Sequence, residues 1–401
     1  MLATAEDSTL SRNLMSSKQR TPPYSTKISR TIREIDPAEW DRLFPETLER
    51  YPFVQTIEET LGQQFTFYYV SIYQGACCVC LVPCFVMDYS LTTTTGGFVK
   101  PLMSAIERMM PRAFTMRVLI CGSPTGEGRI GIAETARQEI VDVLLETLRS
   151  IAKHERLSVL VFKDFSDRYT WLFQALNTAG FHRMPSYPAA WLDINARSWE
   201  AYLASLSKAT RKDLKRKFSK LPSESAITME VRTSLGEDID DAYVLYRKTL
   251  EKSNIHFEVL TKAFFQRLPE YVPDSTKYFL WRMNGKLVAF DLCLASSTLL
   301  LDEYIGMDYD VAYQYHLYFV TFRDMFNWCL TQGIRRYESG VLNYEPKKRL
   351  DFTFSPRINY VKHTNRLLDA VVFTPLAKLL NPERFDPILK TLKHDQVDAT
   401  T

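Results

Sequence analysis

The sequence predicts an α+β protein built from two copies of one structural unit. Two runs of strand-forming residues are each divided by a hairpin signal, Gln74-Gly75 in the first and Asn284-Gly285 in the second. After each hairpin the same elements follow: another strand, a loop, a long amphipathic helix and a closing strand. We therefore expect two mixed, mostly antiparallel sheets, each flanked by helices.

The two copies match element by element. The first has predicted strands at 65–73, 76–87, 115–123 and 157–162, with a helix at 132–154; the second has strands at 277–283, 286–296, 298–307 and 334–339, with a helix at 315–333. The predicted organisation is a disordered tail at 1–30, a first unit at 31–195, a second unit at 196–375, and a C-terminal helix and tail at 376–401.

Composition excludes several classes of protein. Lys and Arg number 50 against 47 for Asp and Glu, a net charge of +3, so the chain lacks the overall basic character of a nucleic-acid-binding protein. No apolar run reaches the roughly 18 to 20 residues that a membrane helix needs. The seven cysteines show no zinc-binding spacing and are expected to be free thiols. These features predict a cytoplasmic protein without a membrane span or a bound metal; the oligomeric state is not defined by the sequence.

One segment is strongly basic. Residues 205–221 hold seven Lys and Arg residues around a single acid, Asp213, and their apolar residues recur at helical spacing. The segment is either a solvated helix face or a site that binds an anion.

The order of elements resembles the GCN5-related N-acetyltransferase (GNAT) fold, and two such copies in one chain resemble the FemAB-like group, including its BioF2-like domains. The segment 333–356 is similar to the group's late glycine, tyrosine and lysine segment. The residues that stand at the places of the group's aromatic and basic motif are Trp199, Tyr202, Ser207, Arg211 and Lys215.

This resemblance implies acyl transfer from a thioester or an aminoacyl ester to an amine. The leading expectation is an N-acyltransferase that uses acyl-coenzyme A (acyl-CoA) as co-substrate, has no permanently bound cofactor, and acts on a small-molecule or phosphate-bearing amine. An aminoacyl-tRNA-dependent amide ligase is the alternative, although the weak net charge makes tRNA the less favoured partner. A non-catalytic scaffold is the second alternative.

In the GNAT fold, coenzyme phosphates bind backbone amides at the start of the central helix. The resemblance makes the first-unit segment with Gly126, Gly128, Arg129 and Gly131 the candidate phosphate loop. The second unit has no glycine there, and His316 stands at the start of its helix.

The resemblance also implies a base for the attacking amine. Glu303 occupies the strand position of that base, while Asp291 and Asp302 lie nearby as substitutes. Strand alternation sends Asp302 and Glu303 to opposite faces, so one should face the cleft while the other packs or pairs. Tyr344 is the candidate acid.

Cations near these residues are expected to bind the substrate. Lys347 and Lys348 follow Tyr344 directly, and Arg211 and Lys215 lie one helical turn apart on the basic helix. The sequence predicts that these four side chains frame a cleft for an anionic group.

Overall fold

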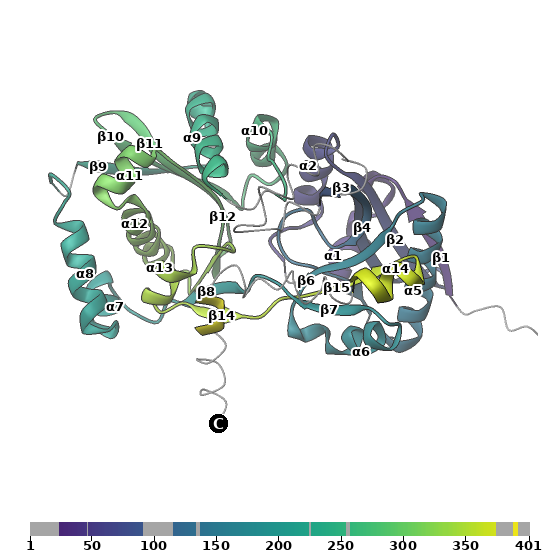
Figure 1. Ribbon diagram of the computed structural model, residues 1–401. Coiled ribbons are helices and arrows are strands. Elements are labelled where there is room, and N and C mark those ends of the chain that lie inside the picture. Colours follow the sequence, from purple (N-terminus) through teal and green to yellow (C-terminus); the bar gives the residue numbers. More distant parts are fainter. Residues whose placement is uncertain are drawn as a thin grey trace, which may run out of the picture.

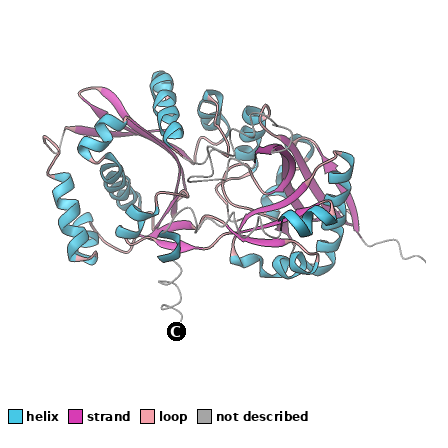
Figure 2. Cartoon of the chain, in the orientation of Figure 1, coloured by secondary structure: helices cyan, strands magenta, loops and turns pink. Residues whose placement is uncertain are grey.

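A computed structural model describes residues 24–45, 47–90, 115–133, 137–223, 226–253, 257–373 and 388–391. Figures 1 and 2 show two twisted sheets side by side, each with helices packed against its faces. Within these ranges, no helix combines the length and the hydrophobicity needed to span a bilayer.

The elements run along the chain in the predicted order. Those up to residue 193 are β1 (Tyr24–Ser29), α1 (Pro37–Leu43), α2 (Tyr51–Leu61), β2 (Thr66–Gln74), β3 (Cys77–Ser90), β4 (Thr115–Cys121), β5 (Gly131–Ile132), α5 (Arg137–His154), β6 (Val159–Phe165), α6 (Thr170–Thr178), β7 (His182–Pro185) and β8 (Ala189–Asp193). Those that follow are α7 (Trp199–Ser205), α8 (Lys208–Phe218), β9 (Ile227–Arg232), α9 (Ile239–Lys252), α10 (Lys262–Tyr271), β10 (Thr276–Met283), β11 (Lys286–Ala295), β12 (Leu299–Met307), α11 (Tyr309–Tyr315), α12 (Leu317–Gln332), β13 (Arg336–Ser339), α13 (Tyr344–Arg349), β14 (Thr353–Ser355), β15 (Ile358–His363) and α14 (Arg366–Leu368).

Both predicted hairpins are present. The turn between β10 and β11 consists of Asn284 and Gly285, both in the left-handed region with φ of 51° and 79°. Such turns join twisted strands tightly, and Asn-Gly is the pair that adopts them most readily. The described thiols of the cysteines are free, and all except Cys77 are buried.

The two units exchange strands, which differs from the predicted partition of the chain. The first sheet has the order β1-β2-β3-β4-β6-β15-β7, and the second has the order β14-β8-β13-β12-β11-β10-β9. Thus β15, late in the chain, lies between β6 and β7, while β8 lies between β13 and β14. In addition, β1 begins at Tyr24, inside the segment predicted as a tail, because all six of its residues pair with β2.

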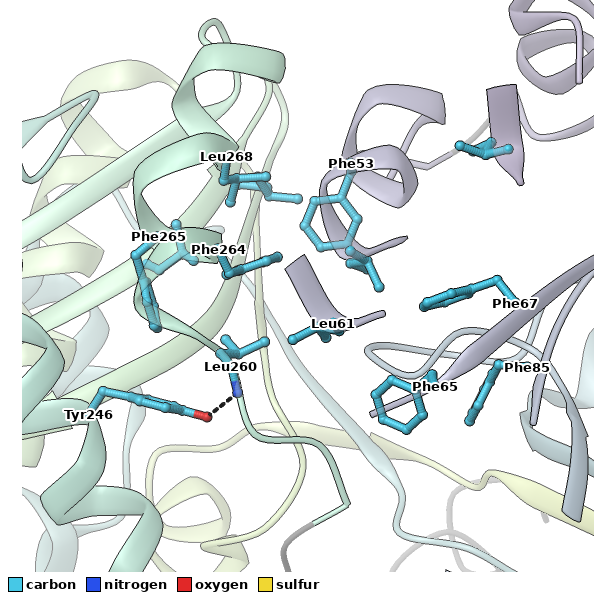
Figure 3. Close-up of a cluster of buried hydrophobic side chains, with 14 of the residues drawn as sticks. Phe53, Leu61, Phe65, Phe67, Phe85, Tyr246, Leu260, Phe264, Phe265 and Leu268 are labelled. Carbon is cyan, nitrogen blue, oxygen red and sulfur yellow. Dashed lines mark hydrogen bonds between the residues drawn. The ribbon is translucent and has the colours of Figure 1, made fainter. Parts of the chain in front are cut away.

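One hydrophobic core is shared by both units. It joins α2 and the first sheet to α9, α10 and the second sheet. Phe53 of α2 meets Phe264 of α10 edge-to-face, with ring centroids 6.2 Å apart. Figure 3 shows this cluster, which includes Phe53, Leu61, Phe65, Phe67 and Phe85 from the first unit and Tyr246, Leu260, Phe264, Phe265 and Leu268 from the second. The shared core fixes the units relative to each other.

Candidate functional site

A cavity of about 2100 Å³ lies between the two units. Its walls include β4 and β6 of the first sheet, β12 of the second sheet, and α11 with the start of α12. This volume exceeds the roughly 300 to 1,000 Å³ of an ordinary ligand pocket, so donor and acceptor could bind together.

The backbone is unusual where it lines this cavity. Parallel pairing of β12 with β13 ends at Asp302 and Ser339, and the chain then departs along the cavity wall. Cavity-lining residues with positive φ and a side chain are Asp164, His316, Leu342 and Asn343. Strained residues of this kind concentrate at functional sites, where the surrounding structure holds them in place.

Glu303 is the extra residue of a β-bulge. In the ladder between β11 and β12, Leu292 pairs with Tyr304 and Cys293 with Asp302, so Glu303 has no opposite residue. Bulges of this kind often lie next to active sites, where they redirect a side chain. The register between β3 and β4 of the first unit is regular throughout, so this feature marks the second unit.

The carboxyl group of Glu303 lines the cavity without a partner for Oε1. That oxygen is shielded from solvent, and no described residue donates a hydrogen bond to it. Burial raises the pKa of Glu303 well above its ordinary value, and the charge of Glu49 raises it further, whereas Arg129 acts in the opposite direction. A carboxyl group with a raised pKa at a cavity wall is suited to exchange a proton with a bound ligand.

Asp302 also lines the cavity, contrary to the expectation that only one of Asp302 and Glu303 would face it, and it is paired with the buried Asp291. Tyr337 donates a hydrogen bond of 2.5 Å to Asp302 Oδ2. Burial and then the charge of Asp302 raise the pKa of Asp291 well above its ordinary value. One ligand atom each of Asp291, Cys293 and Asp302 lies within 4.8 Å of the others, the spacing of a metal site. The charge of Asp302 also acts on the buried cation Lys347, whose pKa it raises against the effect of burial.

Lys347 and Tyr344 are neighbours, with Lys347 Nζ 5.8 Å from the centre of the Tyr344 ring, but only Lys347 reaches the cavity. Lys347 lines the cavity, its Nζ donates to the carbonyl of Gly340, and burial lowers its pKa to about 8 against the opposing charge of Asp302. Tyr344 is not among the residues of the cavity wall; its hydroxyl donates to the carbonyl of Pro188 at 3.0 Å. Lys347 is therefore placed to reach a bound ligand, whereas Tyr344, the predicted acid, is not.

The first-unit glycines make room for neighbouring groups. A Cβ at Gly128 would overlap the carbonyl of Lys163, and one at Gly131 would lie 2.7 Å from Leu43 Cβ. Neither glycine lines the cavity, whereas Gly126 and Arg129 do. Close packing explains Gly128 and Gly131, and their binding of a phosphate has no support from the geometry.

Arg129 binds a residue that the sequence gives no reason to select. Its Nη1 lies 2.9 Å from Glu49 Oε2, and Glu49 lines the cavity from the segment between α1 and α2. Glu49 stands in an irregular stretch with no motif around it, so local pattern could not have identified it. Glu49 comes near Glu303 only when the chain is folded.

The basic helix lies outside the cavity. Arg211 donates to the carbonyls of Ala204 and Leu206, at the end of α7, and Lys215 is exposed. Neither residue lines the cavity wall, and neither does Lys348, whose Nζ lies 3.3 Å from Thr391 Oγ1. Their predicted cleft with Lys347 does not form, because a structural helix-end contact holds Arg211.

His316 does line the cavity. It lies at the start of α12 in the left-handed region, and burial lowers its pKa, with further lowering by Lys220 and Lys217 of the α8 segment. The basic segment thus contributes positive charge at the helix start, from behind the cavity wall.

Comparisons with known proteins identify the family. A family model described as peptidoglycan biosynthesis/recognition matches residues 31–371. The chain belongs to the FemAB-like family. No curated protein sequence matches this FemAB-like protein significantly.

Solved structures agree with the GNAT fold of this FemAB-like protein. FemX has a TM-score of 0.54 at 10% identity, covering 86% of this chain and 99% of its own. A tandem GNAT protein from the clavulanic acid biosynthesis pathway has a TM-score of 0.50 at 9% identity, covering 85% and 99%. The predicted fold class of tandem GNAT-like units is confirmed.

Proposed function

We propose that this FemAB-like protein transfers an acyl group from acyl-CoA to an amine, by direct attack in a ternary complex, with Glu303 as the base. The observation that most supports this proposal is the β-bulge at Glu303, which leaves a shielded and unpartnered carboxyl oxygen at the cavity wall. Family membership and fold support an acyltransferase-type activity. The size of the cavity supports simultaneous binding of both substrates.

In the proposed reaction, the acceptor ammonium first gives one proton to Glu303. The nitrogen then attacks the thioester carbonyl carbon, a C–N bond forms, and the C–S bond breaks. Glu303 later releases its proton to water. The departing thiolate takes up a proton from an acid, which recovers one from the nitrogen, so coenzyme A leaves as the free thiol. We assign delivery of that proton to Lys347, because its pKa of about 8 allows proton donation near neutral pH.

Ligand-induced stabilisation tests the donor. A series of acyl-CoA esters is added to the full chain, and the midpoint of thermal unfolding is measured. A donor present at about 100 times its dissociation constant should raise the free energy of unfolding by about 2.7 kcal/mol. Mass spectrometry then detects an acylated product in mixtures with primary amines. If no acyl-CoA stabilises the protein and no product forms, the donor assignment is wrong.

The basic segment favours a second candidate, an aminoacyl-tRNA-dependent ligase. An extended cationic surface binds a polyanion in a strongly salt-dependent manner. The experiment is filter binding of aminoacyl-tRNA at increasing salt, and a steep fall in affinity together with amide product would favour this candidate. The exposed cations of this surface are Lys208, Lys212, Lys215, Arg216 and Lys220.

A further inference from the structure

Glu49 has the features of a prepared binding group. Its side chain is only 7% exposed, and one carboxyl oxygen, Oε2, is held 2.9 Å from Arg129 Nη1. The other oxygen, Oε1, has no hydrogen-bond partner among the described residues. Leaving a buried polar atom unpaired is costly, so an oxygen in this state indicates a missing donor.

The neighbouring loop accommodates this carboxyl group. Gly126 has a φ of 68°, which a residue with a side chain adopts at a cost, and a Cβ there would overlap Glu49 Oε1. The absence of a side chain at Gly126 therefore allows the position of the Glu49 carboxyl group. Gly126 is thus a second, independent indication that the Glu49 carboxyl group occupies a defined position.

Carboxyl groups are the main electrostatic influence on Glu303. Glu49, Asp302 and Glu258 each raise the pKa of Glu303, and Arg129 alone among the leading influences lowers it. The pKa of Glu49 is itself raised, by burial above all, and the charges of Arg129 and then Lys163 offset this only in part. Two cations, Arg129 and Lys163, thus act on several carboxyl groups.

Two cations of the cavity wall besides Arg129 are already ion-paired. Lys163 Nζ lies 2.7 Å from Asp164 Oδ2, and Arg357 pairs with Glu127. Paired cations offer little to a phosphate group at this point. A ligand that carries its own positive charge fits this part of the cavity better than an anion does.

We infer that the acceptor amine binds as a cation between Glu49 of the first unit and Glu303 of the second, and that Glu49 is an acceptor-binding residue. This inference rests on the proposed function for the identity of the ligand as acceptor. Glu49 holds the ammonium group by a charge-assisted hydrogen bond, while Glu303 receives its proton. The predicted acceptor class is an alkylammonium compound without an anionic group beside the amine, rather than a phosphate-bearing amine.

Direct binding of a probe tests the inference without donor or turnover. Isothermal titration calorimetry compares pentylamine with 1-pentanol, which has a similar size and no charge. The wild-type chain should bind pentylamine more tightly than 1-pentanol. Glu49→Gln should weaken pentylamine binding by about 10-fold or more, the loss expected for one charge-assisted hydrogen bond. Glu345→Gln, at an exposed glutamate outside the cavity, should leave it unchanged.

A second variant keeps the test decisive if Glu49→Gln fails to fold. Gly126→Ala retains the charge and displaces the carboxyl group, so it should weaken pentylamine binding too. Equal binding of pentylamine and 1-pentanol by the wild type would overturn the inference, as would full pentylamine binding by folded forms of both variants. Glu49-dependent binding without any acylated product would instead contradict the proposed function alone.

Discussion

Replacing Glu303 with glutamine is expected to stabilise the protein at neutral and alkaline pH. Burial, and then the charge of Glu49, raise the pKa of Glu303 in the folded state, so the folded chain retains a proton that the unfolded chain releases. Between the unfolded pKa of about 4.3 and the folded pKa, the free energy of unfolding therefore falls by about 1.4 kcal/mol for each pH unit. Glutamine resembles the protonated carboxyl group in shape and has no such proton, so the variant avoids this loss.

Urea unfolding at several pH values from about 5 to 8 measures the effect. The difference in free energy of unfolding between Glu303→Gln and the wild type should grow as pH rises and level off above the folded pKa. Glu345→Gln, which removes an exposed partner of Arg349, should show no such growth over the same range. A constant difference across that range, or a variant less stable than the wild type at the highest pH, would refute the reasoning, because Glu303 would then be ionised and compensated in the folded state.

Three further substitutions test the fold and the site. Phe264→Ala removes a fully buried ring from the shared core and should lower the free energy of unfolding by about 3 to 5 kcal/mol in a single urea transition; two separate transitions would contradict one continuous core. Lys347→Met should lower kcat of the proposed reaction by about 100-fold or more. Tyr344→Phe should lower the free energy of unfolding by only about 1 kcal/mol. Equal losses of kcat in the two variants would argue against Lys347 as the acid. Arg211→Ala should lower the free energy of unfolding by about 1 to 2 kcal/mol, because its hydrogen bonds to two carbonyls are lost. Lys212→Ala, at an exposed residue, should change it by no more than about 0.5 kcal/mol. A changed KM with unaltered stability would instead support substrate binding by Arg211.

Local signals account for what the sequence predicted well. The hairpins and the order of strands and helices depend on turn residues and on hydrophobic period, which are properties of short segments. Asn284 and Gly285 form their turn with the expected positive φ angles. The expected alternation of Asp302 and Glu303 fails, because the bulge interrupts it and both residues line the cavity.

The remainder depends on contacts between distant segments. No local pattern in Ile358–His363 specifies that β15 pairs with β6, almost 200 residues earlier in the chain, rather than with its own unit. The bulge at Glu303 depends on the register with β11, which sequence alone did not define. The spacing of Gly128 and Gly131 resembles that of a phosphate-binding loop, which led to the prediction of one. Both glycines are instead needed for close packing.

The position of β15 has a consequence for synthesis of the protein on the ribosome. The strand lies between β6 and β7, so the first sheet has a gap until residue 363 has been made, although β7 ends at Pro185. At about 5 to 20 residues per second, the chain needs roughly 10 to 35 seconds to cover that interval. During this time the facing edges of β6 and β7 have unpaired backbone groups, which are open to pairing with other chains. Completion of the first unit must therefore wait for nearly the whole of the second, and we expect nascent chains arrested before residue 358 to aggregate more readily than chains released after residue 373.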